Sequence, residues 1–448
     1  MLEFRMEKRS ENKEPLKIYI HTFGCQMNEN DSERIAGALI DQGAEVSPSP
    51  EESDLIIINT CAVREKSEEK LYSLLGRLES IKKRKGLKIA VVGCVAQLYR
   101  SRLIEKKPFI DFVIGPDNYR EMKHIIADHF KEKIIATSWS QEWHEVSHPQ
   151  IFRESHISAY VTVMEGCNNF CSYCIVPFTR GREKYRSMEN IIGEVKYLAG
   201  KGYKETQLLG QNVNSYKDPE TGMGFSDLLR EVNSIDGIEW IRFVTSHPKN
   251  FTIDIAKVMK ESRKACHQLH LPVQSGSSLV LKAMNREYTR EEYLEKISIL
   301  RDLMPDISLS TDIIVGFPGE TGKDYQETLS LLENVRFSNI FSFRYSPRPL
   351  TAASLKKETV PFDQKKKRLI ELQNYQKKLQ LELNKSFLGR VIKVLCLGKS
   401  KKDPSLYSGR NEGYQVVNFK SEDNVIGHFV DVRIDSCGPY SLIGEVTQ

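Results

Sequence analysis

The sequence contains no long hydrophobic run and no apolar leader. Its longest apolar stretches, such as Asp54-Leu-Ile-Ile-Ile-Asn59, fall far short of the roughly 18 residues that a membrane-spanning helix requires. Residues 1–17 are charged and lack the apolar centre of a secretory signal. We therefore expect a cytoplasmic protein with no membrane partner.

Neither sign of charge is in large excess, and cysteine is scarce. The 448 residues carry 65 Lys and Arg against 60 Asp and Glu, a formal net charge of +5, which permits an RNA partner but does not require one. Nine cysteines are an odd number in a chain without an export signal, where disulfides are uncommon. The cysteines are therefore expected to be metal ligands, catalytic groups or packing residues.

The first part of the chain alternates short apolar runs with amphipathic stretches. The total length suggests about three domains, and we place the first at residues 15–137. Strands that alternate with helices are typical of a parallel sheet covered on both faces. Strands are predicted at 17–23, 54–59, 88–93 and 111–115, with one helix at 31–41, opened by an acidic cap, and another ending near 84. Residues 138–153 are polar and predict a linker.

A second βα series occupies residues 153–383. Its predicted strands are 159–163, 206–210, 239–245, 268–272, 307–315 and 340–345. Six such units over about 200 residues favour an open (β/α)6 barrel over a closed eight-stranded one. In either arrangement the functional residues lie at the carboxyl ends of the strands.

The C-terminal part has a different pattern. Residues 363–387 predict a basic amphipathic helix that contains Lys365-Lys-Lys-Arg368, and residues 386–448 predict a small all-β barrel with strands at 391–397, 414–419, 428–434 and 441–446. The predicted fold class is thus α/β: a parallel α/β sheet domain, an open barrel and a small β-barrel.

Three cysteines form a Cys-x3-Cys-x2-Cys motif at Cys167, Cys171 and Cys174. Three thiolates on one loop can hold three irons of a [4Fe–4S] cluster. With no fourth cysteine nearby, one iron stays open to chelate S-adenosylmethionine (SAM), and electron transfer to its sulfonium would give a 5′-deoxyadenosyl radical. The alternatives are a zinc site and three unrelated thiols. Zinc prefers a closed set of ligands that often includes His, and no His lies between residues 157 and 246. The motif therefore predicts radical SAM chemistry.

Three further cysteines each follow a predicted strand of the first domain: Cys25, Cys61 and Cys94. Because the carboxyl ends of parallel strands share one edge of the sheet, these thiols are predicted to converge and to bind a second cluster. The alternative is three buried cysteines that act as small hydrophobic residues. That packing role is the one we predict for Cys266, Cys396 and Cys437.

Polar residues and glycines follow the later strands of the open barrel and are predicted to contact SAM or substrate. Two glycines after the fifth strand permit close approach of a ligand to the backbone. For His247, the alternative is a structural role as a cap. The predicted contact residues are Gln211, Asn212, Ser246, His247, Gln274, Asp312 and Gly316.

At these residues the chain resembles the MiaB-type tRNA methylthiotransferases. The matching segments, which span nearly the whole chain, are Gly24–Asn28, Val163–Cys167, Pro177–Arg182, Leu209–Asn214 and Asp312–Glu320. The resemblance implies two [4Fe–4S] clusters, an auxiliary one on Cys25, Cys61 and Cys94 and a SAM-binding one on the loop. It also implies methylthio insertion at C2 of N6-isopentenyladenosine beside the anticodon of tRNA, and a C-terminal TRAM-like barrel.

The resemblance further implies that two SAM molecules are used. One would methylate a sulfur atom at the auxiliary cluster, and the other would supply the radical that abstracts hydrogen from C2. Because C2–H is not acidic, we predict no catalytic base. The implied partners are the tRNA anticodon stem-loop, a reductant protein such as flavodoxin or ferredoxin, and a sulfur or cluster donor.

The sister families modify threonylcarbamoyladenosine of tRNA or a ribosomal protein, and a non-catalytic Fe–S RNA-binding protein is a further alternative. Gln26-Met27 favours the isopentenyladenosine branch, whereas Ser346–Ala353 departs from the usual family pattern. We expect the C-terminal barrel and Lys365-Lys-Lys-Arg368 to bind tRNA through phosphates. Truncation after Ser386 is then expected to weaken tRNA binding and to spare SAM cleavage.

Overall fold

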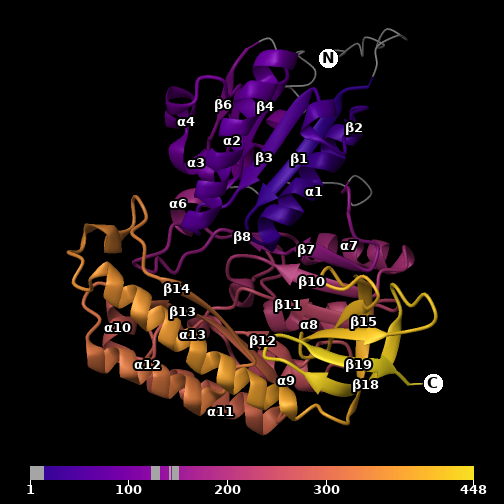
Figure 1. Ribbon diagram of the computed structural model, residues 1–448, viewed down its shortest axis with the longest axis vertical. Coiled ribbons are helices and arrows are strands. Elements are labelled where there is room, and N and C mark those ends of the chain that lie inside the picture. Colours follow the sequence, from indigo (N-terminus) through magenta and orange to yellow (C-terminus); the bar gives the residue numbers. More distant parts are fainter. Residues whose placement is uncertain (1–14, 123–131, 141–142, 144–150, 448) are drawn as a thin grey trace. The chain divides into compact units, whose positions relative to one another are not determined.

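The computed structural model describes residues 15–122, 132–140, 143 and 151–447, which form two compact units that divide between residues 140 and 153. In Figure 1 the first unit is coloured indigo to violet, and the second runs from magenta to yellow. Most of the linker predicted at 138–153 lies outside the described residues.

The first unit is built on a six-stranded parallel sheet with the strand order β2-β1-β3-β4-β5-β6. The strands are β1 (Lys17–Phe23), β2 (Glu45–Val46), β3 (Leu55–Thr60), β4 (Lys88–Val92), β5 (Phe112–Ile114) and β6 (Ile134–Ala136), and the helices are α1 (Gln26–Ile40), α2 (Glu65–Lys85), α3 (Cys94–Tyr99) and α4 (Ser101–Lys106). Every residue of β3 is buried, as expected for a strand covered on both faces.

The predicted start of the first helix is wrong. Helix α1 begins at Gln26, directly after Cys25, rather than at Asp31. Asp31 is buried inside the helix and accepts a hydrogen bond from the Tyr119 hydroxyl at 3.1 Å. The acidic residue therefore makes a tertiary contact instead of capping a helix.

The second unit contains the predicted open (β/α)6 barrel, which is confirmed. Its strands form two three-stranded parallel sheets, β11-β10-β7 and β12-β13-β14, linked by a β-bridge between Ile241 and Ala265. The strands are β7 (Ser158–Thr162), β10 (Glu205–Leu209), β11 (Trp240–Phe243), β12 (Gln268–His270), β13 (Ser308–Val315) and β14 (Asn339–Arg344), and the helices are α6 (Val176–Thr179), α7 (Met188–Gly200), α8 (Phe225–Asn233), α9 (Ile253–Glu261), α10 (Ser278–Ala283), α11 (Arg290–Leu303) and α12 (Gly322–Val335).

The C-terminal segment forms a closed five-stranded barrel in the order β15-β16-β17-β19-β18. The strands are β15 (Val391–Lys399), β16 (Tyr407–Asn411), β17 (Val416–Lys420), β18 (Phe429–Cys437) and β19 (Leu442–Val446). The sequence analysis missed β16, because Tyr-Ser-Gly-Arg-Asn has a single large apolar side chain. Gly409 in its centre has a packing role, since a Cβ there would lie 2.2 Å from the Leu395 carbonyl oxygen.

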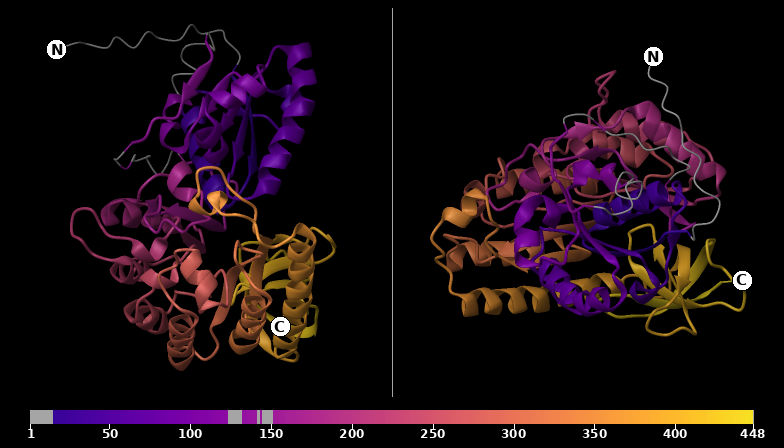
Figure 2. Two further views of the ribbon diagram at one scale, coloured as in Figure 1. Left: turned by 90° about the vertical axis from the view of Figure 1, so that its left-hand side faces the viewer. Right: turned by 90° about the horizontal axis from the view of Figure 1, so that it is seen from above.

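This barrel packs against the amino-terminal ends of the strands of the second unit. Arg242 of β11 is 1% exposed and donates to Glu205 Oε2 at 2.6 Å and to the carbonyl oxygens of Glu412 and Asn411 at 2.6 and 2.8 Å. The Trp240 and Phe429 rings meet edge to face, with centroids 4.8 Å apart. Figures 1 and 2 show the yellow barrel on this side of the second unit. It therefore lies at the opposite strand ends from the cysteine loop after β7.

Helix α13 (Phe362–Lys385) packs against β14 and α12, and half of its basic run is buried. Lys365 is 3% exposed and pairs with Glu358 at 2.8 Å, and Arg368 is 5% exposed and pairs with Glu320 at 2.8 Å. The prediction that these two side chains bind RNA phosphates is therefore wrong. Lys366 and Lys367 are exposed. Neither α13 nor any other helix in the described ranges is apolar enough to cross a membrane.

Candidate metal and cofactor sites

The cysteine loop of the second unit follows β7 and the short strand β8 (Met164–Glu165), which pairs with β9 (Lys184–Tyr185). Gly166 enters the loop with φ of 81°, and a Cβ there would lie 2.0 Å from the Arg182 carbonyl oxygen. Within the loop, the Cys174 N–H donates to the Cys171 carbonyl at 2.9 Å. The backbone therefore turns tightly at the point where the three thiols are needed.

Burial governs the chemistry of these thiols. It is the main cause that raises the pKa of Cys167 to about 11 and that of Cys174 to about 12, and the neighbouring Cys171 adds to both. Because iron binds thiolates, these thiols must lose their protons when a cluster binds. In the described ranges no three His, Cys, Asp or Glu side chains are arranged around a single metal ion. A cube whose cysteines each bind a different iron does not need that arrangement.

Two side chains from distant parts of the chain contact Cys171, namely His247 after β11 and Arg286 in the turn between α10 and α11. The Nε2 atom of His247 lies 3.8 Å from its Sγ, and Nη1 of Arg286 donates to the same sulfur at 3.3 Å. Burial, with Arg286 and Lys249 nearby, lowers the pKa of His247 to about 2, so the imidazole is neutral. His247 also accepts the Lys249 N–H at the start of a 3-10 turn. It is thus both a cap and a neighbour of the cysteine loop.

Gln211, Asn212 and Ser246, predicted to contact SAM, also lie at this end of the strands. The Gly166 N–H donates to Gln211 Oε1 at 2.5 Å, which ties Gln211 to the start of the loop. Asn212 Oδ1 and Ser246 Oγ are buried and have no hydrogen-bond partner among the described residues. Buried polar atoms are normally paired. The two orphaned atoms therefore fit a polar ligand such as SAM beside the cysteine loop.

Glu183 organises the same site and was missed in the sequence analysis. Its Oε1 accepts from the Asn168 N–H at 3.3 Å, Asn212 Nδ2 at 3.3 Å and Ser215 Oγ at 3.1 Å, and its Oε2 accepts from Tyr185 Oη at 2.6 Å. One carboxylate therefore connects the cysteine loop to the residues after β10. Its position next to the Pro177–Arg182 motif was the available signal.

Of the other three predicted contacts, Asp312 lies in β13, Gly316 directly follows β13, and Gln274 forms an isolated β-bridge with Ile313. Gln274 is 7% exposed and adopts a left-handed backbone with φ of 76°, a strained conformation for a residue other than glycine. Asp312 is half-buried, and one of its oxygens lies 3.6 Å from His270 Nε2. The structure thus does not place the Asp312 side chain in contact with the cysteine loop.

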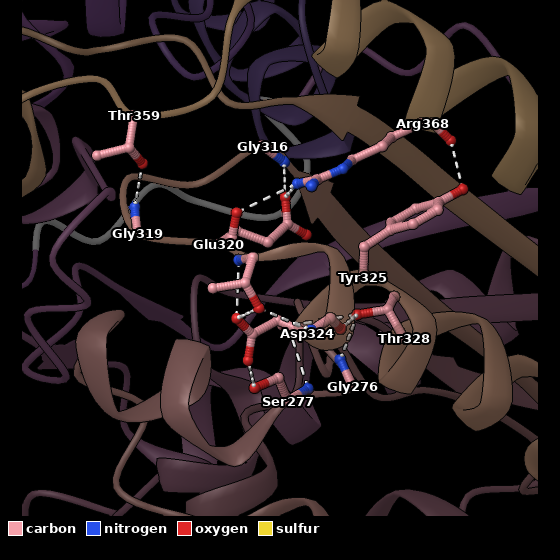
Figure 3. A network of polar contacts seen from close by, with 12 residues as sticks. Gly276, Ser277, Gly316, Gly319, Glu320, Asp324, Tyr325, Thr328, Thr359 and Arg368 are labelled. Atoms are coloured by element: carbon pink, nitrogen blue, oxygen red, sulfur yellow. Dashed lines mark hydrogen bonds and ion pairs between the residues drawn. The ribbon is translucent and has the colours of Figure 1, made fainter.

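Gly316 belongs to a separate polar network, drawn in Figure 3. Its N–H donates to Glu320, which pairs with Arg368, and a Cβ on Gly316 would lie 2.3 Å from Lys365. The predicted close approach at this glycine was that of a ligand to the backbone, which stays a prediction. The neighbour in the structure is α13.

The first unit brings Cys25, Cys61 and Cys94 together, as predicted from their strand ends. Cys25 is the residue before α1, Cys61 follows β3, and Cys94 is the first residue of α3. Hydrogen bonds with Cys25 and Cys94, followed by burial, raise the pKa of the Cys61 thiol well above its usual range. Three convergent sulfur atoms are the soft donor set that iron–sulfur clusters use. These residues therefore fit a cluster.

A buried pair of asparagines supports this thiol site. Asn28 Nδ2 donates to Asn59 Oδ1 at 2.9 Å, and Asn59 Nδ2 donates back to the Asn28 carbonyl at 2.9 Å. The pair joins α1 to β3. Gly93 allows the chain to pass, because a Cβ there would lie 2.3 Å from Asn59 Oδ1. The remaining cysteines, Cys266, Cys396 and Cys437, pack in apolar clusters as predicted.

Three family models match the chain. They are described as "Uncharacterized protein family UPF0004" for residues 17–115, "Radical SAM superfamily" for residues 161–332 and "TRAM domain" for residues 385–447. Each match falls on a separate structural part: the thiol-bearing sheet, the open barrel and the C-terminal barrel.

Curated relatives match the chain over nearly its full length. It is 44% identical to the tRNA-2-methylthio-N(6)-dimethylallyladenosine synthase of Acetivibrio thermocellus over 455 residues, which cover 100% of this chain and 94% of the relative. It is 46% identical to the enzyme of the same name from Clostridium botulinum (strain Loch Maree) over 435 residues, 96% of each chain. The relative of that name from Thermodesulfovibrio yellowstonii is 44% identical, covering 96% of this chain and 98% of its own.

Solved structures share the fold at low sequence identity. The radical S-adenosylmethionine methyltransferase TsrM from Kitasatospora setae aligns with a TM-score of 0.56 at 13% identity, covering 76% of this chain and 75% of that one. The cobalamin-dependent S-adenosylmethionine radical enzyme OxsB aligns with a TM-score of 0.53 at 14% identity, covering 82% and 56%. At such identities the likeness concerns the fold alone.

Proposed function

This chain belongs to the family of tRNA-2-methylthio-N(6)-dimethylallyladenosine synthases, and from that premise we propose how its two sets of cysteines divide the reaction. The protein is a radical SAM enzyme with a [4Fe–4S] cluster and SAM as cofactors. It methylthiolates C2 of N6-dimethylallyladenosine in tRNA. Cys167, Cys171 and Cys174 hold the SAM-binding cluster, and Cys25, Cys61 and Cys94 hold an auxiliary cluster that serves sulfur insertion.

The observation that carries this division is the presence of two all-thiol sets. One is a contiguous loop, and the other is assembled from three strand ends, where the Cys61 thiol contacts those of Cys25 and Cys94. Packing alone does not require three sulfurs at equivalent strand ends. An enzyme that both generates a radical and inserts sulfur needs two such sites.

When bound, the cluster on the loop supplies an electron that cleaves SAM to methionine and a 5′-deoxyadenosyl radical. The chain's own residues hold the cofactor. Asn212 Oδ1 and Ser246 Oγ lack partners among the described residues, which supports assigning them to SAM binding, while Gln211 fixes the start of the loop. Neutral His247 and Arg286 orient Cys171. We assign Gln274, Asp312 and Gly316, which lie in or beside β13, to shaping the substrate side.

Three functional parts follow from this assignment. Residues 15–137 form the methylthiotransferase domain, residues 153–383 the radical SAM barrel, and residues 386–448 a tRNA-binding barrel. The substrate is the anticodon stem-loop of tRNA. A low-potential reductant protein such as flavodoxin or ferredoxin supplies electrons, and a separate donor supplies sulfur or clusters. We also propose a cytoplasmic location, where these partners would be available.

The test is mass spectrometry of tRNA nucleosides from cells with and without this protein. The expected result is loss of the methylthio group from dimethylallyladenosine, with the dimethylallyl group retained. Restoration by the wild-type chain but not by Cys171→Ala ties the effect to the loop. A methylthio group lost from threonylcarbamoyladenosine instead, or unchanged tRNA, would contradict the proposal.

A further inference from the structure

A buried arginine outside the cysteine motifs contacts the SAM-binding loop. Arg286 is 3% exposed, and all three of its guanidinium nitrogens are used. Nη1 donates to Cys171 Sγ at 3.3 Å, Nη2 to the Pro272 carbonyl at 2.6 Å and Nε to the Tyr288 hydroxyl at 2.8 Å. No Asp or Glu in the described ranges forms an ion pair with it. The Cys171 sulfur, a thiolate once it binds iron, is therefore the negatively charged group beside Arg286.

The local backbone directs this side chain inward. Asn285 and Glu287, on either side of Arg286, have φ values of 58° and 57°, a left-handed conformation that costs energy for residues other than glycine. Asn285 Nδ2 donates to the Phe170 carbonyl at 3.1 Å, and Glu287 pairs with Lys249 at 2.5 Å. The turn is thus fixed on one side to the cysteine loop and on the other to the segment after His247.

The electrostatic consequence follows from the sign of the charges. A cluster bound by three thiolates gains negative charge when it accepts an electron. A permanent positive charge in a dry interior stabilises the more negative, reduced state, and hydrogen bonds to the sulfurs and local charge are among the factors that set cluster potentials. Arg286 supplies both a hydrogen bond and a positive charge at one cluster ligand, Cys171.

We propose that Arg286 is a positioning residue that orients Cys171 and raises the reduction potential of the SAM-binding cluster, so that an external reductant reduces the cluster more readily. The inference rests on the proposed function, because it requires the cluster on Cys167, Cys171 and Cys174. It adds a charged residue that belongs to neither cysteine set.

The test uses full-length reconstituted protein and a titration of the oxidised cluster with dithionite, in which electron paramagnetic resonance follows the reduced form. Cys61→Ala serves as the background, so that one cluster is observed. On this background Arg286→Met should keep its iron, while its ratio of reduced to oxidised cluster falls about tenfold at the wild-type midpoint, as expected for loss of a hydrogen bond to a charged group. Cleavage of SAM without tRNA should slow in parallel. Full iron with an unchanged midpoint would overturn the proposal.

Two further variants keep the test decisive. Arg290→Met removes an arginine that donates to the Gly276 carbonyl at 3.1 Å but contacts no cysteine, and it should leave the midpoint unchanged. Arg286→Lys keeps the charge and loses the planar fork, so its midpoint should shift less than that of Arg286→Met and in the same direction. If Arg286→Met holds no iron, the test rests on Arg286→Lys. A midpoint potential of Arg286→Lys equal to that of the Cys61→Ala background would then reject the proposed role of Arg286. Absence of any cluster signal in the background protein itself would instead reject the proposed function.

Discussion

The imidazole of His247 bridges the backbone of one strand end and the thiol of another. Its Nδ1 accepts the Lys249 N–H at 3.2 Å, and its Nε2 lies 3.8 Å from Cys171 Sγ. A neutral imidazole that accepts at Nδ1 carries its proton on Nε2. His247 therefore presents an N–H to the Cys171 sulfur, the same atom to which Arg286 donates.

The depressed pKa of His247 predicts acid lability of the cluster-free protein. The folded pKa is about 2 against 6.5 in the unfolded chain, so below about pH 6.5 the unfolded state binds a proton that the folded state refuses. The free energy of unfolding should then fall by about 1.4 kcal/mol per pH unit between pH 6 and 4. Urea unfolding of the wild type and of His247→Gln at several pH values measures this pH dependence of the free energy of unfolding. Equal slopes for the two proteins would show that His247 is protonated in the folded chain.

Single cysteine variants should separate the two sites. Wild-type protein reconstituted without oxygen should hold about eight irons, from two four-iron cubes. Cys171→Ala should lose about half of this iron and all SAM cleavage. Cys61→Ala should lose a similar share, yet keep reductive SAM cleavage and lose methylthiolation. Cys266→Ala, at a packing cysteine, is the control and should keep all of the iron. A Cys61→Ala protein that methylthiolates tRNA at the wild-type rate would make the strand-end cysteines structural.

The two kinds of lysine in α13 should behave differently. Lys366 and Lys367 are exposed, so replacing both with Ala should weaken tRNA binding and reduce its salt dependence by up to about two phosphate contacts. Lys365→Ala removes a buried side chain paired with Glu358 and should lower stability instead. Filter binding at several salt concentrations, with thermal unfolding of each variant, distinguishes the effects. Identical salt slopes for wild type and the double variant would exclude this face of α13 from the tRNA interface.

Removal of Arg242 should loosen the C-terminal barrel. Arg242→Met leaves the Glu205 carboxylate buried without its partner and frees the carbonyls of Asn411 and Glu412, a loss of about 3–5 kcal/mol for a broken buried pair. The urea midpoint measures this loss. Lys393→Met is the matched control, because its pair with Glu239 joins the same two parts but is exposed, and such pairs contribute little. Equal midpoints for the two variants would contradict the account.

The same contacts change the expected effect of truncation after Ser386. The barrel covers Trp240, Arg242 and Cys266, which are buried in the full chain. Truncation would expose them and should lower the stability of the open barrel, in addition to weakening tRNA binding. SAM cleavage by such a fragment is therefore not expected to match that of the full chain.

The sequence predicted those features that depend on local pattern and on sheet topology. Convergence of Cys25, Cys61 and Cys94 followed from their position after parallel strands, since such strand ends share an edge. The six barrel strands followed from periodicity. By contrast, Asp31 is of a residue type that often caps helices, and the cap was predicted on that ground. Its actual partner, Tyr119, is 88 positions away, so no local pattern indicates the contact.

Long-range charge pairing was not predictable from one sequence. The sequence Lys365-Lys-Lys-Arg368 is typical of a solvent-exposed basic surface. In the structure, however, Lys365 is buried against Glu358 and Arg368 against Glu320. Arg286 stands in an ordinary polar stretch, and its partner Cys171 is 115 positions away. Such pairs depend on how elements that are distant in the sequence pack together in space, which periodicity does not encode.

The most direct test of the central claim follows the hydrogen atom that methylthiolation must remove. Reconstituted wild-type protein is given SAM, a reductant, a sulfur source and tRNA whose dimethylallyladenosine carries deuterium at C2. The account predicts 5′-deoxyadenosine that contains deuterium, together with tRNA that has gained a methylthio group at that carbon. Deoxyadenosine without deuterium, formed while the tRNA keeps its label and gains no sulfur, would contradict it.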